Sequence, residues 1–235
     1  MLLLIVAQLD LHAQYKVDKF SLDGNLYSWY DQEIGKNNSG ILVGQYQEIQ
    51  RLTRKTHQFF GSKEWANVTL KFRGQQYDSI FALYDISKDV FVIKHPVDFR
   101  LHNQPILLPQ DQIEWFLMNN HAFRYYPEGI KLIPPGFFDE LFISNEIALV
   151  AKRKKNVETN QTLEYEPSDQ YFLNFDGEYH KVWGRWSVLN VLKPYKSKLK
   201  SYITANQLRI KAKAENDGDL IELLDYAQQL ITPTE

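Results

Sequence analysis

Aromatic side chains beside a cation are the residues of this sequence best suited to binding chemistry. Three aromatic residues and one cation fall on one predicted β-hairpin: Trp115, Tyr125, Tyr126 and Arg124. Because side chains alternate along a strand, Tyr125 lies on one face while Arg124 and Tyr126 share the other. Aromatic faces stack on apolar surfaces and on cations, so an exposed Tyr beside an Arg can bind a sugar or a protein. These four residues are the predicted ligand-binding site, unless core covers one face and helices cover the other.

Two pairs of carboxylates are the remaining candidates for catalysis. They are Asp139 with Glu140 and Asp111 with Glu114. Glycoside hydrolysis needs two carboxyl groups that face each other across a cleft at a defined separation. The sequence gives no separation between strands, so we predict no catalytic residue, and a carboxylate-dependent hydrolase is the weakest function considered.

Metal and cofactor chemistry has few candidate residues. The chain has no cysteine, which excludes disulfides, thiolate metal sites and cysteine nucleophiles. His95 and His102 flank a loop with Asp98 between them, but scattered histidines at strand ends are more often hydrogen-bonded to backbone. Phosphate-loop, dinucleotide, zinc-protease and serine-hydrolase motifs are absent from the sequence. We therefore predict no metal and no cofactor.

The composition is that of an ordinary folded protein. Of 235 residues, 44% are apolar and 24% are charged, which excludes disordered, collagen-like and coiled-coil chains. The 27 basic and 29 acidic residues leave a net charge of −2, so nucleic acid is not an expected partner. The unusual feature is the number of aromatic residues, 14 Phe, 14 Tyr and 5 Trp, which must fill a core or form a binding surface.

Residues 1–13 are predicted to be a signal peptide. Leu2 to Ala7 form a short apolar run, and the small residue Ala13 precedes a polar stretch, as at a signal-peptidase site. No Lys or Arg precedes the run and Asp10 interrupts it, so a cytosolic protein that opens with a buried strand is the alternative. We expect an exported protein that is periplasmic, outer-membrane-associated or extracellular. We expect no transmembrane segment, because no later stretch is apolar enough to span a bilayer as a helix.

Residues 65–185 predict an antiparallel sheet, whereas residues 14–64 are mixed and give no clear pattern. Short segments rich in β-branched and aromatic residues alternate with turn signals about every eight to twelve residues. The pairs Asn119-Asn120 and Asp176-Gly177 suit two-residue hairpin turns. No helix of crossover length separates the segments, which argues against parallel pairing. We predict an antiparallel sheet or incomplete barrel of about nine strands.

Residues 186–235 predict a helical pair packed on the sheet, so the fold class is α+β and mostly β. Ser187 can cap a short helix and Pro194 suits the first turn of a second. Asp217 can cap a final helix whose leucines form one apolar stripe.

Charge is segregated in the last third of the chain. Lys181 to Lys213 holds nine basic residues and no acidic one, and Asn216 to Glu235 holds five acidic residues and no basic one. We interpret this as two helices with complementary faces; a basic surface for anionic lipid or polysaccharide is the alternative. The run Lys152 to Lys155 precedes a polar stretch, 156–166, and is typical of a solvated strand end.

Two groups of structural motifs stand out along the chain. They are His57-Gln58-Phe59-Phe60, Trp65, Val68-Thr69-Leu70, Gly74, Tyr77, Tyr84-Asp85-Ile86 and Asp89, then Asp169-Gln170-Tyr171-Phe172-Leu173, Asp176-Gly177, Lys193 to Ile203 and Leu223-Leu224-Asp225-Tyr226. With these motifs the chain resembles a group of exported β-rich proteins of Bacteroidota to which no activity is attached. The resemblance covers His57 to Ile231 and implies a run of strands, a lysine-rich helix, a final helix and an envelope location.

The function expected from these observations is binding. We expect a non-enzymatic, exported envelope protein that binds a protein or a glycan or forms part of an envelope assembly. The alternative is a lipocalin-like carrier, in which about eight strands close around a small apolar ligand before a C-terminal helix. The sequence does not predict the oligomeric state.

Overall fold

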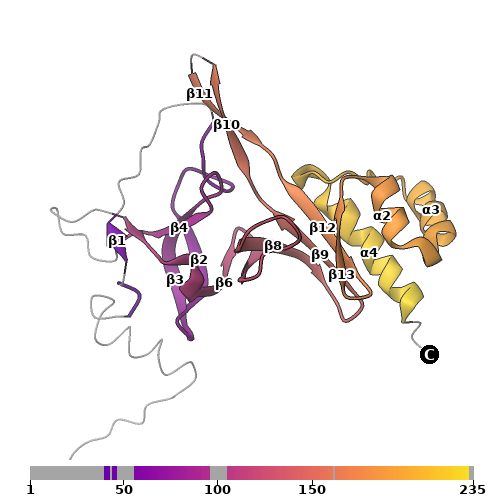
Figure 1. The fold of residues 1–235 in the computed structure, drawn as a ribbon, viewed down its shortest axis with the longest axis horizontal. Helices are drawn as coiled ribbons and strands as arrows, with labels where there is room; N and C mark the ends of the chain where they lie inside the picture. Colours follow the sequence, from indigo (N-terminus) through magenta and orange to yellow (C-terminus); the bar gives the residue numbers. More distant parts are fainter. Residues whose placement is uncertain (1–39, 43, 47–55, 96–104, 161, 233–235) are drawn as a thin grey trace, which may run out of the picture.

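The computed structural model describes residues 40–42, 44–46, 56–95, 105–160 and 162–232. The predicted signal peptide, residues 1–13, and most of the mixed segment 14–64 lie outside these ranges. The described residues form an antiparallel, mostly β fold with helices at its C-terminal end (Figure 1). The predicted fold class is therefore confirmed.

Eleven strands form one curled, open half-barrel sheet. Their order is β1-β5-β4-β3-β2-β6-β7-β8-β9-β12-β13, and every pairing is antiparallel. The strands are β1 (Gln45–Tyr46), β2 (Ala66–Phe72), β3 (Gln75–Asp85), β4 (Val90–Ile93), β5 (Ile106–Leu107), β6 (Ile113–Met118), β7 (His121–Tyr126), β8 (Gly136–Ile143), β9 (Ile147–Lys152), β12 (Gln170–Phe175) and β13 (Glu178–Val182).

Two-residue turns join the hairpins where the sequence predicts them. Asn119 and Asn120 connect β6 to β7 with φ values of 52° and 64°. Asp176 and Gly177 connect β12 to β13 with φ values of 55° and 78°. Positive φ at both central positions matches the right-handed twist of the flanking strands, and Asn, Asp and Gly adopt it most readily.

A second, two-stranded sheet projects beyond the main one, at the top of Figure 1. It consists of β10 (Lys155–Asn160) and β11 (Thr162–Pro167), which continue the chain after β9 and before β12. These strands lie in the polar stretch 156–166, where apolar alternation gave no strand signal. The two strands pair with each other over their full length.

Aromatic rings fill the curled part of the sheet. We call this buried set the barrel cluster. Tyr84, Phe116 and Phe137 contact one another edge to face, with ring centroids 5.1–5.7 Å apart. Offset and edge-to-face ring pairs add to the stabilisation from burial itself. Large buried members of the barrel cluster are Leu70, Phe72, Tyr77, Tyr84, Phe91, Ile93, Phe116, Met118, Phe123 and Phe137.

The helices cover the sheet from β9 to β13, on the right of Figure 1. Their apolar stripes and the facing strand residues form a second buried set, the helix cluster, which includes Leu149, Tyr171, Leu173, Leu199 and Leu223. The elements are α2 (Arg185–Val191), α3 (Lys196–Ala205) and α4 (Asp217–Ile231), with 3₁₀ turns η2 (Gln110–Gln112), η3 (Lys193–Tyr195) and η4 (Ala214–Asn216).

The helix starts differ in detail from the sequence prediction. Ser187 lies inside α2, where its Oγ accepts hydrogen bonds from the backbone N–H groups of Trp183 and Gly184. Pro194 belongs to η3 rather than to the first turn of α3. Asp217 is the first residue of α4, after Asn216 as the cap. No helix of the described residues has the length and hydropathy of a membrane span.

Candidate functional site

The predicted aromatic site lies on β6 and β7. Trp115 and Arg124 are direct cross-strand partners, so their side chains emerge on the same face. Tyr125 points to the other face, where its ring lies 5.6 Å from that of Phe137 in the barrel cluster. The structure thus brings Trp115 and Arg124 together and separates them from Tyr125, as strand alternation predicts.

Glu140 on β8 neutralises this site. Its Oε1 accepts a hydrogen bond of 2.8 Å from Arg124 Nε and one of 3.3 Å from the Tyr126 hydroxyl. The Tyr126 ring packs on Phe138 at 5.0 Å, and burial raises the pKa of its hydroxyl. Arg124, Tyr125 and Tyr126 therefore all contact neighbours within the fold. Of the four predicted site residues, this leaves the half-buried ring of Trp115 for a ligand.

The candidate catalytic carboxylates Asp139 and Glu140 do not face each other. Asp139 and Glu140 are consecutive on β8 and point to opposite faces of the sheet, Asp139 toward Arg153 and Glu140 toward Arg124. Glu114 forms an ion pair of 2.7 Å with Lys71 on the surface. An acid and a base cannot act on one glycosidic bond from opposite sides of a strand.

The candidate metal residues are only partly described. His95 follows β4, whereas His102 and Asp98 lie outside the described residues. Among the described residues no group of three or more His, Asp or Glu side chains is arranged to hold a metal ion.

A buried arginine, Arg153, joins the sheet to α4. Its side chain is 2% exposed, although the sequence pattern at Lys152 to Lys155 predicts a solvated strand end; that interpretation is wrong for Arg153 and for Lys152, which is also buried. The reason is long-range: carboxylates from three other segments surround the guanidinium. Arg153 contacts Asp139 at 2.7 Å, Asp169 at 3.0 Å and Asp217.

The same network holds two more side chains. Tyr171 accepts a hydrogen bond of 2.8 Å from Arg153 and donates one of 2.6 Å to Asp217. His121 Nδ1 lies 2.8 Å from Asp139 Oδ2. Burial alone lowers the pKa of Arg153, but the charges of Asp139 and its other partners more than offset this and raise the pKa overall. Every charge here has an internal partner, so the network is structural rather than a site for a ligand.

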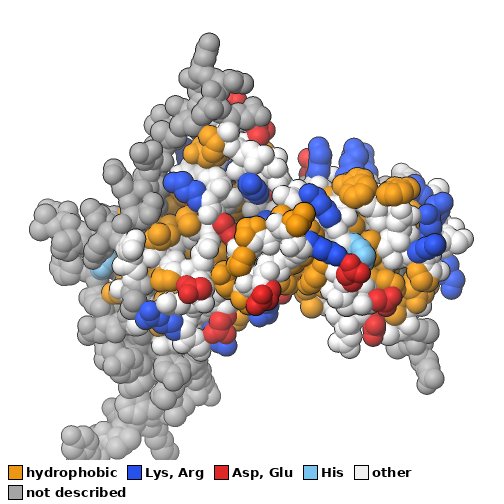
Figure 2. All heavy atoms as spheres, in the orientation of Figure 1, with side chains coloured by type: hydrophobic (Ala, Val, Ile, Leu, Met, Phe, Trp, Pro, Cys, Tyr) orange, Lys and Arg blue, Asp and Glu red, His pale blue; other side chains and the backbone are white. Residues whose placement is uncertain are grey.

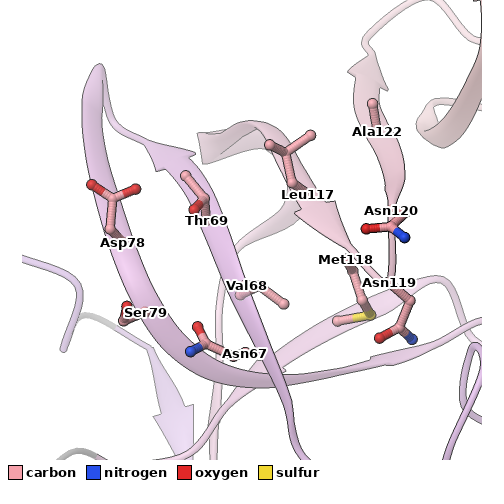
Figure 3. Close-up of a pocket in the computed structure, with 10 residues that line it drawn as sticks. All are labelled: Asn67, Val68, Thr69, Asp78, Ser79, Leu117, Met118, Asn119, Asn120 and Ala122. Carbon is pink, nitrogen blue, oxygen red and sulfur yellow. The ribbon is translucent and has the colours of Figure 1, made fainter.

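A groove of about 640 Å³ opens beside the hairpins β2–β3 and β6–β7 (Figure 3). Amide and hydroxyl groups line much of it, and Leu117, 47% exposed, contributes an apolar side. Its chemistry suits a hydroxyl-rich ligand. Asp78 is the one charged residue in its lining, and no aromatic ring lines it. The lining residues are Asn67, Val68, Thr69, Asp78, Ser79, Leu117, Met118, Asn119, Asn120 and Ala122.

Trp183 and Trp186 form an exposed aromatic pair where β13 gives way to α2. The two residues are 63% and 64% exposed, and their ring centroids lie 6.0 Å apart with 31° between the planes. Two backbone hydrogen bonds hold this segment against residues 210–212. The N–H of Ala212 donates to the Trp183 carbonyl at 3.3 Å, and the N–H of Arg185 donates to the Ile210 carbonyl at 3.0 Å. Two exposed indoles are thus held side by side on a rigid backbone.

This pair is not among the candidate sites predicted from the sequence. Trp183 lies between β13 and α2 and Trp186 lies in the first turn of α2, so the pair belongs to no single strand or helix. Exposure at such a junction depends on how the chain turns, which only the fold defines.

The basic side chains of this part of the chain have no carboxylate partners among the described residues. None of the nine Lys and Arg residues from Lys181 to Lys213 forms an ion pair with any described residue. The helices α3 and α4 do pack together, but through a stacked pair, Tyr202 and Tyr226, with centroids 4.0 Å apart. The predicted pairing of basic and acidic helix faces is therefore not made by ion pairs, and Figure 2 shows Lys and Arg side chains gathered over the helical end.

Comparison with known proteins identifies no relative. No protein-family model, no curated protein and no solved structure matches this chain. The exposed tryptophan pair and its unpaired cations are the features of the described residues from which a binding function can be inferred.

Proposed function

We propose that this protein is a non-enzymatic, exported component of a cell envelope that binds a glycan through Trp183 and Trp186. The observation that carries the proposal is the exposure of two neighbouring indole rings on a backbone fixed by hydrogen bonds. Tryptophan is usually well buried, because its large apolar surface is unfavourable in water. An exposed pair is therefore expected to gain stabilisation by covering that surface with a ligand.

Sugar rings suit these indoles better than an extended apolar partner does. The C–H face of a pyranose packs on an aromatic ring while its hydroxyl groups remain hydrated or hydrogen-bonded at the edges. Two rings 6.0 Å apart and inclined by 31° lie close enough for adjacent sugars of one chain to stack on them. A preorganised platform also loses little side-chain entropy on binding.

Export is supported by the sequence rather than by the geometry. The apolar start of the chain and the resemblance to exported Bacteroidota proteins favour an envelope location. Amino-terminal sequencing of the protein from its host's envelope fraction should find a chain that begins near Gln14. A cytosolic protein that retains Met1 would contradict export.

The two alternative functions lack a favourable arrangement in the described residues. A carrier needs an apolar cavity, whereas the described part of the curled sheet is filled by the aromatic rings of the barrel cluster. A hydrolase needs facing carboxylates, whereas Asp139 and Glu140 lie on opposite faces.

Isothermal titration of the folded protein against a panel of neutral and acidic polysaccharides tests the proposal. Trp183→Ala and Trp186→Ala should each weaken binding about tenfold or more, since stacking on one aromatic side chain contributes on the order of 1–3 kcal/mol. Leu132→Ala is the control, because Leu132 is also highly exposed but lies outside the site. Trp115→Ala tests the β6–β7 site separately.

The variants distinguish the possible outcomes. Loss of binding in Trp183→Ala and Trp186→Ala with Leu132→Ala unchanged supports the proposal. Binding to no polysaccharide in the panel, or binding that only Trp115→Ala removes, would overturn it.

A further inference from the structure

We infer that the Trp183–Trp186 platform selects acidic glycans, those whose sugars carry carboxylate groups; this rests on the proposed glycan-binding function. The observation behind it is the uncompensated positive charge around the rings. The stretch from Lys181 to Lys213 carries nine positive charges and no negative one, in a chain whose net charge is −2.

The nearest cations are held beside the indoles by the backbone. Arg185 lies between the two tryptophans in the chain and is exposed. Lys211 pairs with Gly184 in an isolated antiparallel bridge, and its neighbour Ala212 donates to the Trp183 carbonyl at 3.3 Å. Lys213 follows on the same segment and is exposed as well. Three cations therefore flank the platform on two hydrogen-bonded segments.

These cations lack carboxylate partners among the described residues, in contrast to Lys71 and Lys131. Elsewhere Lys71 is paired with Glu114 at 2.7 Å and Lys131 with Glu178 at 2.5 Å. Around the platform, no described carboxylate lies within ion-pairing distance of any of the nine basic side chains. Like charges that gather without counter-charges repel one another, and a polyanionic ligand removes that repulsion.

A polysaccharide fits this surface better than a membrane does. The apolar stripes of α3 and α4 face inward, since Leu199, Ile203 and Leu223 are buried in the helix cluster. A helix that binds in a bilayer interface presents such a stripe outward. Trp183 and Trp186 are the only large apolar side chains of α2, α3, α4 and their described connections that are classed as exposed, so the surface offers two rings and cations rather than an inserting face.

Polygalacturonate and its fully methyl-esterified form provide matched ligands, because the sugar backbone is the same and only the carboxylate charge differs. We expect wild-type protein to bind the acid at least about tenfold more tightly than the ester at low salt. The variant Arg185→Gln/Lys211→Gln/Lys213→Gln should lose that preference while still binding the ester. The control Lys63→Gln/Lys88→Gln/Lys94→Gln removes three exposed cations elsewhere and should keep it.

The outcomes distinguish failure of acid selectivity from failure of glycan binding. Equal binding of acid and ester that Trp186→Ala abolishes would overturn acid selectivity and leave glycan binding standing. An equal loss of preference in both triple variants would also overturn it, because the effect would then come from net charge alone. Binding to phosphatidylglycerol vesicles or to a single-stranded oligonucleotide, with neither polysaccharide bound, would assign the surface to a membrane or to nucleic acid and overturn the inference together with the proposed function.

Discussion

The guanidinium of Arg153, at the end of β9, contacts the carboxylate of Asp217, the first residue of α4, which lies 64 positions further along the chain. This contact ties the start of the last helix to the end of β9, the third strand from the β13 edge of the sheet. Asp217 is well placed for it, because a negative charge in the first turn of a helix also interacts favourably with the helix dipole.

Removing the arginine should destabilise the fold strongly. Arg153→Met leaves Asp139 and Asp217 buried without a cation, and breaking a buried pair in this way typically lowers the free energy of unfolding by about 3–5 kcal/mol. Urea denaturation measures the change. Arg124→Met is the control, because it removes only the surface pair with Glu140, worth less than about 1 kcal/mol. Equal losses in the two variants would contradict a stabilising network at Arg153.

A methyl group at Gly136 should disturb a second ion pair. A Cβ there would collide with the Asp89 carboxylate and lie 2.5 Å from Lys152 Nζ, which are themselves paired at 2.5 Å. We expect Gly136→Ala to lower the free energy of unfolding by about 1–3 kcal/mol. Gly218→Ala in α4 is the matched control, since its Cβ meets nothing within 4 Å and Ala favours a helix by up to about 1 kcal/mol. The melting temperature should fall in Gly136→Ala and rise in Gly218→Ala. A higher melting temperature for Gly136→Ala than for wild type would contradict the prediction.

The stability of the protein should depend on His57 below neutral pH. Burial, and then the charge of Lys155, lower the pKa of His57 below 6.5, and its Nδ1 accepts a hydrogen bond of 3.2 Å from the Phe59 N–H. As pH falls below 6.5, the unfolded chain takes up a proton on His57 before the folded protein does. Protonation therefore favours unfolding until pH passes below the folded pKa.

Denaturation of wild type and His57→Gln between about pH 7.5 and pH 5 measures this effect. Wild type should lose more stability than the variant as pH falls through that window. Parallel stability profiles for the two proteins would show that the His57 pKa is not lowered on folding.

The exposed tryptophans should matter little for folding. Trp183→Ala and Trp186→Ala are expected to change the free energy of unfolding by no more than about 0.5 kcal/mol, because surface substitutions rarely do more. Trp115→Ala should have a larger effect, since its ring is partly buried between β2 and β7. Chemical denaturation measures the free energy of unfolding of the three variants. Acrylamide should quench the tryptophan fluorescence of wild type more than that of Trp183→Phe/Trp186→Phe, because the two exposed indoles are absent from the variant.

The sequence predicted those features that depend on local pattern. Asn119-Asn120 and Asp176-Gly177 were identifiable because positive φ at both turn positions suits few residue types. The apolar stripe of α4 was identifiable because Leu220, Leu223 and Leu224 follow the helix period. In each case the residues that determine the structure are neighbours in the chain.

The features that were missed depend on contacts between distant segments. Lys152 and Arg153 look like a solvated strand end until carboxylates from other elements are placed around them. The strands β10 and β11 lie in a stretch with few apolar residues, and their pairing with each other reveals them. The exposure of Trp183 and Trp186 likewise follows from the turn between β13 and α2, which no periodicity encodes.

The polar junction at Asp139 and Arg153 lies between two apolar clusters on the same face of one sheet. Phe123 on one side of Asp139 belongs to the barrel cluster, and Ala151 on the other side belongs to the helix cluster. Opening the helical layer exposes the second cluster and leaves the first packed. A single hydrogen-bonded sheet therefore spans two cooperative units, and amide protons of α2, α3 and α4 should exchange with solvent at a lower free energy than those of β2, β6 and β7.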